Sequence, residues 1–320
     1  TVVVEPTPDV VINNTKPTLV CENGTVTMEV TVSDATGGVL ATDLDWTINY
    51  TVDGTAMSFN GSGNGTATVD ITNISKDIEV ELVSIVTRGA NGMQCDNLDL
   101  DDKFEIDVID LPTATVNSSP SELCTGSTVS FSVDVSKVGT TETWSLVYEL
   151  EGNTSETVSG TGSGTFNFTT AATVSNATTA PLTQQLYLRS ITNTGVSPTT
   201  GAACSVVDMD TADITVYPVS DAKTASSSSV SICNGEGVTL TADAAIVGDI
   251  TGWQYKNSST SGVWTAINSS ATSPFAVVNI TETTDYRVIV KSGPCSQDES
   301  VMVTVVVEPT PDVVINNTKP

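Results

Sequence analysis

Apolar and polar residues alternate along most of this chain, in short runs that are separated by turn residues. Three such runs begin at cysteines, with the sequences CENGTVTMEV, CTGSTVSFSV and CNGEGVTLTA. A period of two places every second side chain on the same face of an extended strand. No long stretch has the helical period, and aromatic residues make up only 5% of the chain. We therefore predict an all-β protein of many short strands with polar outer faces.

Proline ends three of the alternating strands and divides the chain. The segments are VVVEP at 305–309 and again at 2–6, IDVIDLP at 106–112, and ITVYP at 214–218. We expect each to close one domain and to open the next, which gives domains of ordinary size. The predicted division is the last strand of a preceding repeat at 1–8, β-sandwich domains at 9–111, 112–217 and 218–308, and the start of a following repeat at 309–320.

The first seventeen residues return unchanged near the end of the sequence. TVVVEPTPDVVINNTKP occupies positions 1–17 and again 304–320. Selection on a fold preserves an apolar pattern rather than identity, so tandem duplication is the natural cause. The period is about 303 residues, too long for a solenoid unit and suited to several domains. We expect a tandem array in which neighbouring repeats of the same chain are partners.

Six cysteines form no C-x-x-C pair, and the chain has no His to complete a zinc set. They are Cys21, Cys95, Cys124, Cys204, Cys233 and Cys295. Six cysteines allow fifteen pairings. Each predicted domain holds one early and one late cysteine, which favours one disulfide per domain: 21–95, 124–204 and 233–295. Disulfides indicate an extracellular protein, and free buried thiols are the alternative.

After the alternating strand that follows the first cysteine of each domain, the next predicted strand carries a tryptophan, at Trp46, Trp144 and Trp253. We interpret all three as core residues that pack near the disulfide. Trp264 differs because it lies in a Ser-rich stretch. It is our candidate for an exposed aromatic residue that stacks on a ligand sugar, with burial as the alternative.

The order of cysteine, turn, strand, tryptophan, cysteine, strand and proline resembles the Ig-like and PKD-like domains repeated in giant cell-surface adhesins of Bacteroidetes. The third domain carries the resemblance best, with ICNGEGVTLTA, GWQYKNSSTSGVWTAI and TTDYRVIVKSGPCSQDESVMVTVVVEP. The resemblance implies three tandem Ig-like β-sandwich domains per repeat, export to the cell surface by the type IX route, and a role in adhesion or gliding motility. The long middle sections of the first two domains depart from the pattern.

The formal net charge of −27 argues against nucleic acid as a partner, because eleven basic residues supply no patch for a phosphate backbone. The longest apolar run, at 301–307, is far shorter than a membrane span. Without His there is no imidazole base, and we predict that the protein is not an enzyme. GSGNGT at 61–66 and GTGSGT at 160–165 precede Thr/Val strands rather than a helix, which favours hairpin turns over phosphate loops.

The densest acidic segment is DNLDLDDKFEID at 96–107, where acidic and apolar residues alternate. A solvated outer face of a strand explains this pattern. Carboxylates on one face also offer the oxygen ligands that calcium prefers, although no EF-hand loop is present. The candidate calcium ligands are Asp99, Asp101, Glu105 and Asp107. We predict no other cofactor.

Asparagine often begins an N-x-[ST] sequon here, which predicts N-glycans on a secreted surface. The alternative is that Asn favours turns and Thr favours the strands that follow them. The candidate acceptors are Asn13, Asn23, Asn49, Asn60, Asn64, Asn73, Asn117, Asn153, Asn167, Asn176, Asn257, Asn268 and Asn279.

Three functions fit these features. The first is a structural repeat of a long extracellular filament or adhesin stalk, which acts as a mechanical spacer. The second is an array of carbohydrate-binding modules that recognises surface polysaccharide with avidity. The third is a non-covalent, pilus-like polymer in which the seventeen-residue string is a strand donated between subunits.

Overall fold

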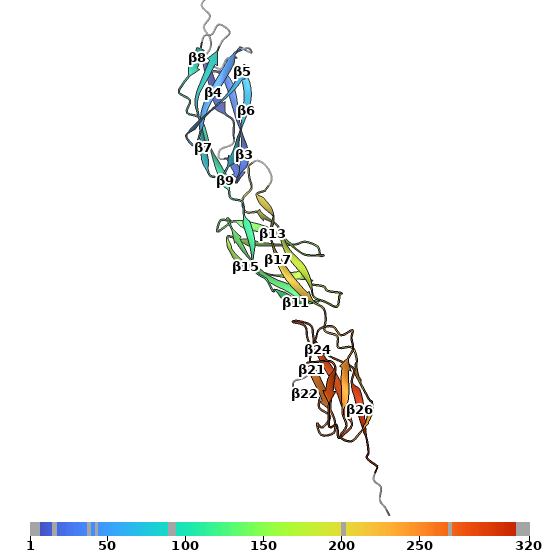
Figure 1. Cartoon of the computed structure of the whole chain (residues 1–320). Coiled ribbons are helices and arrows are strands. Elements are labelled where there is room, and N and C mark those ends of the chain that lie inside the picture. Colours follow the sequence, from blue (N-terminus) through green and yellow to red (C-terminus); the bar gives the residue numbers. More distant parts are fainter. Residues whose placement is uncertain are drawn as a thin grey trace, which may run out of the picture.

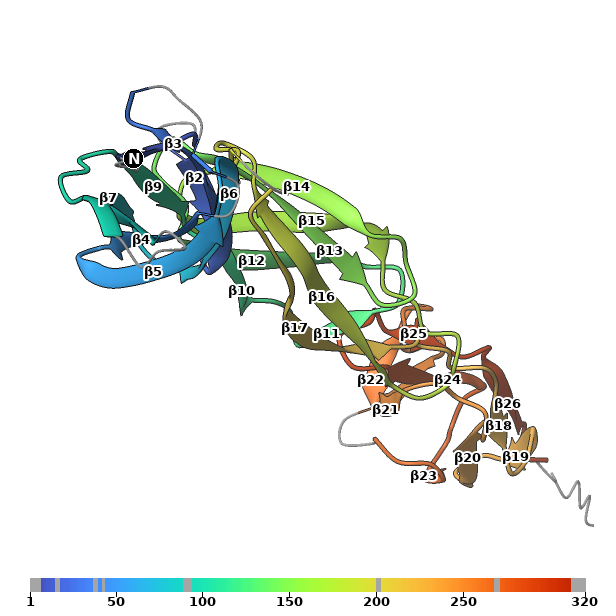
Figure 2. The same ribbon diagram turned by 90° about the horizontal axis from the view of Figure 1, so that it is seen from above.

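The computed structural model describes residues 7–14, 18–36, 40–41, 44–88, 94–199, 203–267 and 271–311. These residues form strands and turns, with no helix among them. Three β-sandwiches follow one another end to end along the chain (Figure 1), and they appear in the same order in the view from above (Figure 2). None of the described segments is a helix long and apolar enough to cross a membrane.

The first sandwich pairs a three-stranded sheet, in the order β1-β3-β6, with a larger sheet in the order β2-β9-β7-β4-β5, in which β8 also pairs with β7. Among the strand pairs that the structure describes in this sandwich, only β2 and β9 run parallel. The strands are β1 Pro8–Ile12, β2 Thr18–Cys21, β3 Gly24–Asp34, β4 Asp45–Val52, β5 Thr55–Ser62, β6 Gly65–Ile74, β7 Ile78–Arg88, β8 Gln94–Asn97 and β9 Lys103–Ile109.

The second and third sandwiches repeat this strand order, as β10-β12-β15 with β11-β17-β16-β13-β14 and as β18-β20-β23 with β19-β26-β24-β21-β22, where β25 pairs with β24. The second contains β10 Thr113–Ser118, β11 Glu122–Cys124, β12 Thr128–Ser136, β13 Thr143–Leu150, β14 Glu156–Thr161, β15 Gly164–Thr173, β16 Leu182–Asn193 and β17 Ser205–Tyr217. The third contains β18 Ala225–Ser227, β19 Ser231–Cys233, β20 Val238–Ala242, β21 Asp249–Lys256, β22 Thr265–Ile267, β23 Phe275–Val277, β24 Thr284–Lys291, β25 Asp298–Glu299 and β26 Val303–Glu308.

Each sandwich thus has a short strand early in its sequence that pairs in parallel with its last strand, as β2 with β9, β11 with β17 and β19 with β26. Two sheets with this order and this parallel edge are an Ig-like arrangement. The predicted all-β fold of tandem Ig-like sandwiches is confirmed. The repeated string contributes to two sandwiches, because 304–308 lie in β26 while 8–12 form β1.

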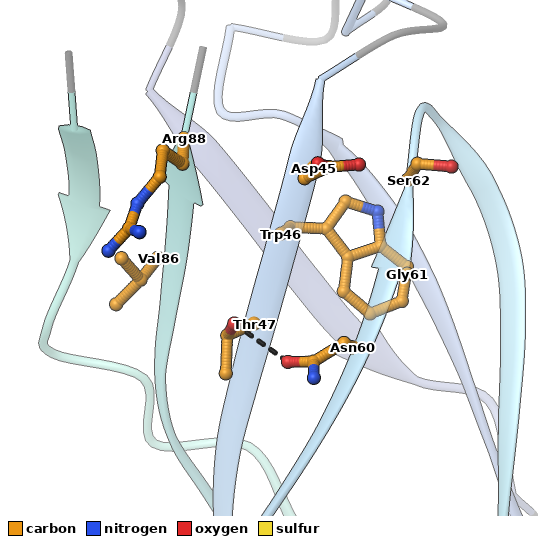
Figure 3. Close-up of a pocket in the computed structure, with 8 residues that line it drawn as sticks. All are labelled: Asp45, Trp46, Thr47, Asn60, Gly61, Ser62, Val86 and Arg88. Carbon is orange, nitrogen blue, oxygen red and sulfur yellow. Dashed lines mark hydrogen bonds between the residues drawn. The ribbon is translucent and has the colours of Figure 1, made fainter. Parts of the chain in front are cut away.

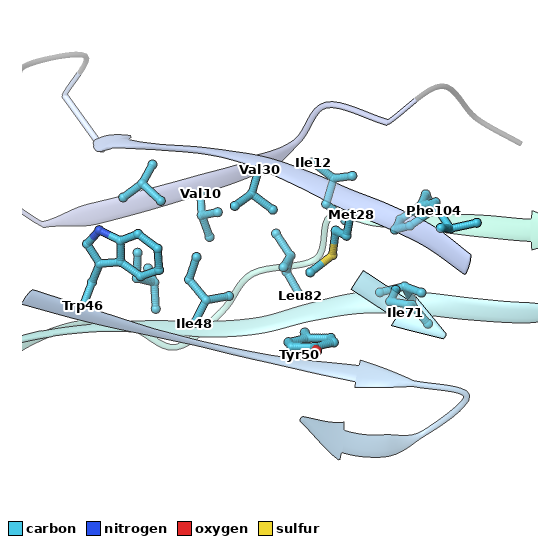
Figure 4. Close-up of a cluster of buried hydrophobic side chains, with 14 of the residues drawn as sticks. Val10, Ile12, Met28, Val30, Trp46, Ile48, Tyr50, Ile71, Leu82 and Phe104 are labelled. Carbon is cyan, nitrogen blue, oxygen red and sulfur yellow. The ribbon is translucent and has the colours of Figure 1, made fainter. Parts of the chain in front are cut away.

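The three central tryptophans are buried, which confirms their prediction as core residues; Trp144 and Trp253 are at most 1% exposed. Figure 4 shows Trp46 on β4 among the apolar side chains of the first sandwich. Each indole N–H donates a hydrogen bond to a backbone carbonyl oxygen, from Trp46 to Gly63 at 2.9 Å, from Trp144 to Gly162 at 3.0 Å and from Trp253 to Thr272 at 2.9 Å.

Two glycines leave room for these indole rings. A Cβ atom on Gly61 would lie 2.2 Å from the Trp46 ring, and one on Gly160 would lie 2.3 Å from the Trp144 ring. The glycine segments at 61–66 and 160–165 therefore serve packing. The prediction that they are hairpin turns was wrong, because β5 and β6 belong to different sheets, as do β14 and β15. The turns carry the chain from one sheet to the other.

Candidate functional site

Two disulfides cross from one sandwich to the next. Cys21 in the first sandwich bonds to Cys204 in the second, and Cys124 in the second bonds to Cys295 in the third. The predicted pairings 21–95, 124–204 and 233–295, with one disulfide inside each domain, were wrong. Each junction between sandwiches instead has two covalent connections, the peptide linker and a disulfide.

The strand register explains why the two cysteines of one sandwich do not pair. In the second sandwich, Cys204 comes just before β17, while Cys124 lies opposite Tyr217 at the end of β17. A strand of 13 residues is roughly 43 Å long at about 3.3 Å per residue. A disulfide needs Cα atoms within about 7 Å. We call the end with Cys204 the leading end of a sandwich and the end with Cys124 its trailing end.

The bonded cysteines have little solvent exposure at the leading ends. Cys204 is 1% exposed and Cys295 is 2% exposed. The remaining two cysteines, Cys95 and Cys233, are thiols in this structure, and Cys233 is exposed. The structure therefore forms two of the three disulfides that the cysteine count allows, both between sandwiches.

Polar contacts support the first junction. The N–H of Leu19 donates to Oγ1 of Thr199 at 2.8 Å, and the N–H of Thr199 donates back to the Leu19 carbonyl oxygen at 3.0 Å. Nζ of Lys137 in the second sandwich lies 2.9 Å from Oε2 of Glu22 in the first. The same carboxylate accepts a 3.2 Å hydrogen bond from the N–H of Leu111 in the linker. Glu22 thereby connects three segments.

These contacts change the acid–base behaviour of the ion pair. The hydrogen bond from Lys137, with a second from the Leu111 N–H, holds the pKa of Glu22 below its ordinary value despite partial burial. The same hydrogen bond to Glu22 raises the pKa of Lys137. Both groups therefore stay charged at neutral pH, when the ion pair is intact.

The second junction relies on close packing. Gly293 has a φ of +47°, and a Cβ atom there would lie 2.4 Å from the ring of Tyr217. Sγ of Cys295 lies 3.2 Å from the Pro218 carbonyl oxygen, so this disulfide sits against the linker. Ser220 ties the linker to the third sandwich, because its hydroxyl donates to the Ser296 carbonyl oxygen at 2.6 Å.

A pocket of about 580 Å³ opens between β4, β5 and β7 of the first sandwich (Figure 3). Trp46 and Gly61 are among the residues that line it, and Oγ1 of Thr47 donates a 2.8 Å hydrogen bond to Oδ1 of Asn60. Among the described residues that line it, only Asp45 and Arg88 carry charge. Its described lining holds no histidine and no cysteine, and we assign the pocket no chemistry.

The candidate calcium ligands do not gather. Asp99 and Asp101 are exposed between β8 and β9, whereas Glu105 and Asp107 lie on β9. In the part of the chain that the structure describes, no three His, Cys, Asp or Glu residues are placed to hold a metal ion. The acidic segment fits the solvated face of a strand from Lys103 onward.

The candidate glycan acceptors fall into groups by exposure. Asn176 is 7% exposed and its amide donates to the carbonyl oxygens of Ala180 and Val216, so it has a structural role. Asn49 and Asn257 are half-buried, and Asn268 lies outside the described residues. The exposed candidates are Asn13, Asn23, Asn60, Asn64, Asn73, Asn117, Asn153, Asn167 and Asn279. Among these, Asn23, Asn73 and Asn279 have positive φ, a conformation that Asn tolerates better than most residues.

Trp264 is half-buried on the outer face of the third sandwich. Cζ of Arg287 lies 4.2 Å from the centroid of its ring, and Nζ of Lys256 lies 4.9 Å from it. Cation–π contacts therefore occupy ring surface that a bound sugar would need. Arg287 is itself held by a 2.9 Å ion pair with Glu299.

Sequence reasoning missed an aspartate in each sandwich whose carboxylate holds the first segment of that sandwich. In each sandwich, the aspartate lies between the second cysteine and the end of the last strand. Its carboxylate accepts a hydrogen bond from a backbone N–H in or just before the first strand of the same sandwich. The pairs are Asp102 with Ile12 at 2.7 Å, Asp210 with Val116 at 2.8 Å and Asp298 with Ala222 at 2.8 Å. Recurrence of an aspartate a few positions after each second cysteine was a signal that could have revealed it.

Comparison with known proteins gives a partial family match and distant structural similarity. Residues 221–309 match the family described as Domain of unknown function (DUF8696). No curated protein matches the chain. Domains A168–A170 of titin have 14% identity and a TM-score of 0.31, and the match covers 94% of this chain and 99% of that chain.

Two further solved structures are similar at the same level. Chicken CNTN1 FN1–FN3 domains have 10% identity and a TM-score of 0.30, over 95% of this chain and 99% of that chain. A tetra-tandem repeat in the extending region of a large adhesion protein has 12% identity and a TM-score of 0.29, over 95% of this chain and 74% of that chain. Similarity at this level carries no function from those proteins to this chain.

Proposed function

We propose that this chain is a repeat of a long extracellular surface filament or adhesin stalk, in which it transmits tension between neighbouring domains. The observation that carries the proposal is the pair of disulfides between sandwiches, Cys21–Cys204 and Cys124–Cys295. A disulfide inside a domain protects that domain alone. A disulfide between domains adds a second covalent connection along the direction in which the domains follow one another.

The disulfides shorten the covalent path through the chain. Without them, a pull on the first and last residues can extend all 320 residues, or roughly 1,150 Å at about 3.6 Å per residue. With both disulfides, the shortest covalent path passes about 130 residues, or roughly 460 Å. Most of the first and third sandwiches then lies outside this path, whereas residues 124–204 of the second sandwich remain in it. The fully extended length is therefore less than half of that of the chain without disulfides.

The disulfides support an extracellular location within this proposal, because disulfides persist in oxidising compartments. The net charge of −27 keeps neighbouring fibres apart in solution. The resemblance to repeats of giant Bacteroidetes adhesins supports a cell-surface stalk. On that basis we place export by the type IX route, adhesion and gliding motility, as well as N-glycans on the exposed sequons, within the proposal.

Specific observations weigh against the two alternatives. A carbohydrate-binding array loses its best candidate, since Arg287 and Lys256 lie over the Trp264 ring. Strand donation between subunits would require the repeated string to leave its own sandwich. Instead, Thr304 pairs with Asp285 and Val305 with Thr284 in β24 of the same chain.

Single-molecule stretching of the full chain tests the proposal. We expect the oxidised chain to reach a maximum extension less than half that of the chain pre-treated with a reducing agent, because reduction opens both closed loops. The matched control carries Ser in place of Cys95 and Cys233, which are thiols here. It should behave like the oxidised parent. Equal extension of the oxidised and reduced chains would contradict a role in transmitting tension.

A further inference from the structure

Cys233 lies at the trailing end of the third sandwich in the position that bonded cysteines hold in the other two. In each sandwich a short strand pairs in parallel with the last strand. The cysteine of this short strand lies opposite a residue near the end of the last strand. The pairs are Cys21 with Ile109, Cys124 with Tyr217 and Cys233 with Glu308. Cys233 is exposed and carries a thiol. It therefore has the geometry of a junction cysteine.

Cys95 holds the matching position at the leading end of the first sandwich. The two sandwiches can be compared from their central tryptophans. Trp46 lies opposite Thr87 in the first sandwich, and Trp144 lies opposite Asn193 in the second. Oγ1 of Thr87 donates a 3.0 Å hydrogen bond to the carbonyl oxygen of Cys95, and the N–H of Asn193 donates a 2.9 Å hydrogen bond to that of Cys204. Cys95 thus occupies the place of the bonded Cys204.

The spacing of cysteines across the junctions is constant. The interval in sequence from Cys95 to Cys124 is identical to the interval from Cys204 to Cys233. Counting through the repeated string, the interval from Cys295 to the Cys21 of a following copy is the same again. By contrast, the interval between the two cysteines of one sandwich differs in all three sandwiches. The constant unit of the sequence is therefore the segment that joins two sandwiches.

We propose that Cys233 forms a disulfide with Cys95 of the next copy of this sequence in the same polypeptide. The inference rests on the proposed function as a tandem repeat. Each thiol loses one proton and the two sulfurs share one bond. The two electrons pass to a disulfide oxidant, a small molecule or a protein, which is reduced to two thiols. The partner is thus a second copy of this chain.

This third disulfide completes two continuous covalent paths along the array. One path enters a sandwich at its leading cysteine, follows the last strand, crosses the linker and ends at the trailing cysteine of the next sandwich. Such a segment extends to at most roughly 100 Å, at about 3.6 Å per residue. The other path passes the same junction through the disulfide. At each junction one path runs through the peptide linker and the other through the disulfide, and at the next junction these roles are reversed.

A chain of two copies tests the inference, with residues 1–303 followed by residues 1–320. After oxidative folding with glutathione, free thiols are alkylated and the chain is digested with trypsin without reduction. Lys and Arg positions place Cys95 alone in peptide 89–103 and Cys233 alone in peptide 224–256. We expect these two peptides to be linked in about half of their copies and alkylated in the rest, because only one pair meets at the central junction.

Matched variants assign the link. Cys233→Ser in the first copy should abolish the linked peptide, whereas Cys233→Ser in the second copy should leave it and remove the alkylated peptide 224–256. Full alkylation of both peptides in the unsubstituted chain would overturn the inference. So would a link found only in covalent multimers on non-reducing electrophoresis. The result expected from the stretching test of a single copy does not depend on Cys95 or Cys233, because its control replaces both, so the two proposals can fail separately.

Discussion

The two junctions share a disulfide and the spacing of their cysteines in sequence, and they differ in the side-chain contacts around the disulfide. Both have a disulfide from the trailing end of one sandwich to the leading end of the next. The first adds an ion pair between Lys137 and Glu22, whereas the second packs Gly293 against the Tyr217 ring. Side-chain contacts have diverged while the disulfide has stayed. The difference indicates that the disulfide holds the sandwiches together and that the other contacts set how often each junction opens.

The largest expected effect concerns the disulfides. We expect Cys21→Ser with Cys204→Ser, or Cys124→Ser with Cys295→Ser, to raise the maximum extension by only about a fifth or less, because the remaining disulfide still shortens the covalent path. All four substitutions together should more than double it. Single-molecule stretching measures each chain. A large gain from one junction alone would show that the two are not equivalent.

The next effect separates the second junction from the first. Gly293→Ala places a methyl group against the Tyr217 ring at a positive φ. Strain of about 1 kcal/mol or more should raise the reduction rate of Cys124–Cys295 about fivefold or more, with Cys21–Cys204 unchanged. Timed reduction, alkylation and tryptic mapping measure both rates, since the six cysteines fall in six tryptic peptides.

Gly152→Ala is the matched control for this substitution. Gly152 also has a positive φ, of +79°, but a Cβ atom added there would have no neighbour within 4 Å. The substitution should leave both reduction rates unchanged. If Gly152→Ala accelerated reduction as much as Gly293→Ala, the contact with Tyr217 would not be the cause.

A smaller effect should appear only at the first junction. Glu22→Gln removes the charge that Lys137 faces, and we expect reduction of Cys21–Cys204 to become on the order of twofold faster. Added salt should give a similar change in the parent chain. Glu79→Gln is the control, because Glu79 pairs with Lys103 inside the first sandwich. Equal acceleration by both variants would assign the effect to net charge.

The smallest effect is a dependence on pH. The pKa of Glu22 is lowered in the assembled junction. Its contribution to the stability of the closed junction is therefore fully present above the ordinary carboxyl pKa and is lost as pH falls through the lowered value. The ratio of the Cys21–Cys204 rate to the Cys124–Cys295 rate should therefore rise in acid. A phosphine reductant, which works at low pH, measures it. The ratio should stay flat in Glu22→Gln.

The alternation of apolar and polar residues, together with the prolines that end strands, predicted much of the fold. Strands with a period of two, the buried tryptophans and the use of the repeated string by two sandwiches all follow from local pattern, since burial of one strand face is a local property. The hairpin prediction at 61–66 failed because a turn between sheets and a turn within a sheet have the same glycine-rich sequence. Only pairing over long separations distinguishes them.

The cysteine pairing failed for a related reason. The division of the chain at prolines suggested that each domain should contain its own disulfide. The direction of the strands instead places Cys124 and Cys204 at opposite ends of one sandwich. Direction could not be known without the parallel pairing of β11 with β17. The constant spacing of cysteines across junctions was present in the sequence, and it marked the junction as the constant unit of the repeat.

The first linker shows what a doubled connection means for a protein exposed to proteases. Asp110, Leu111 and Pro112 join β9 to β10, and a cut at any of them leaves the first two sandwiches attached through Cys21–Cys204. A cut elsewhere between residues 21 and 204 opens the same ring without parting it. A junction with a disulfide parts only where two lesions coincide, so at low damage the probability that it parts rises with the square of the damage to each connection.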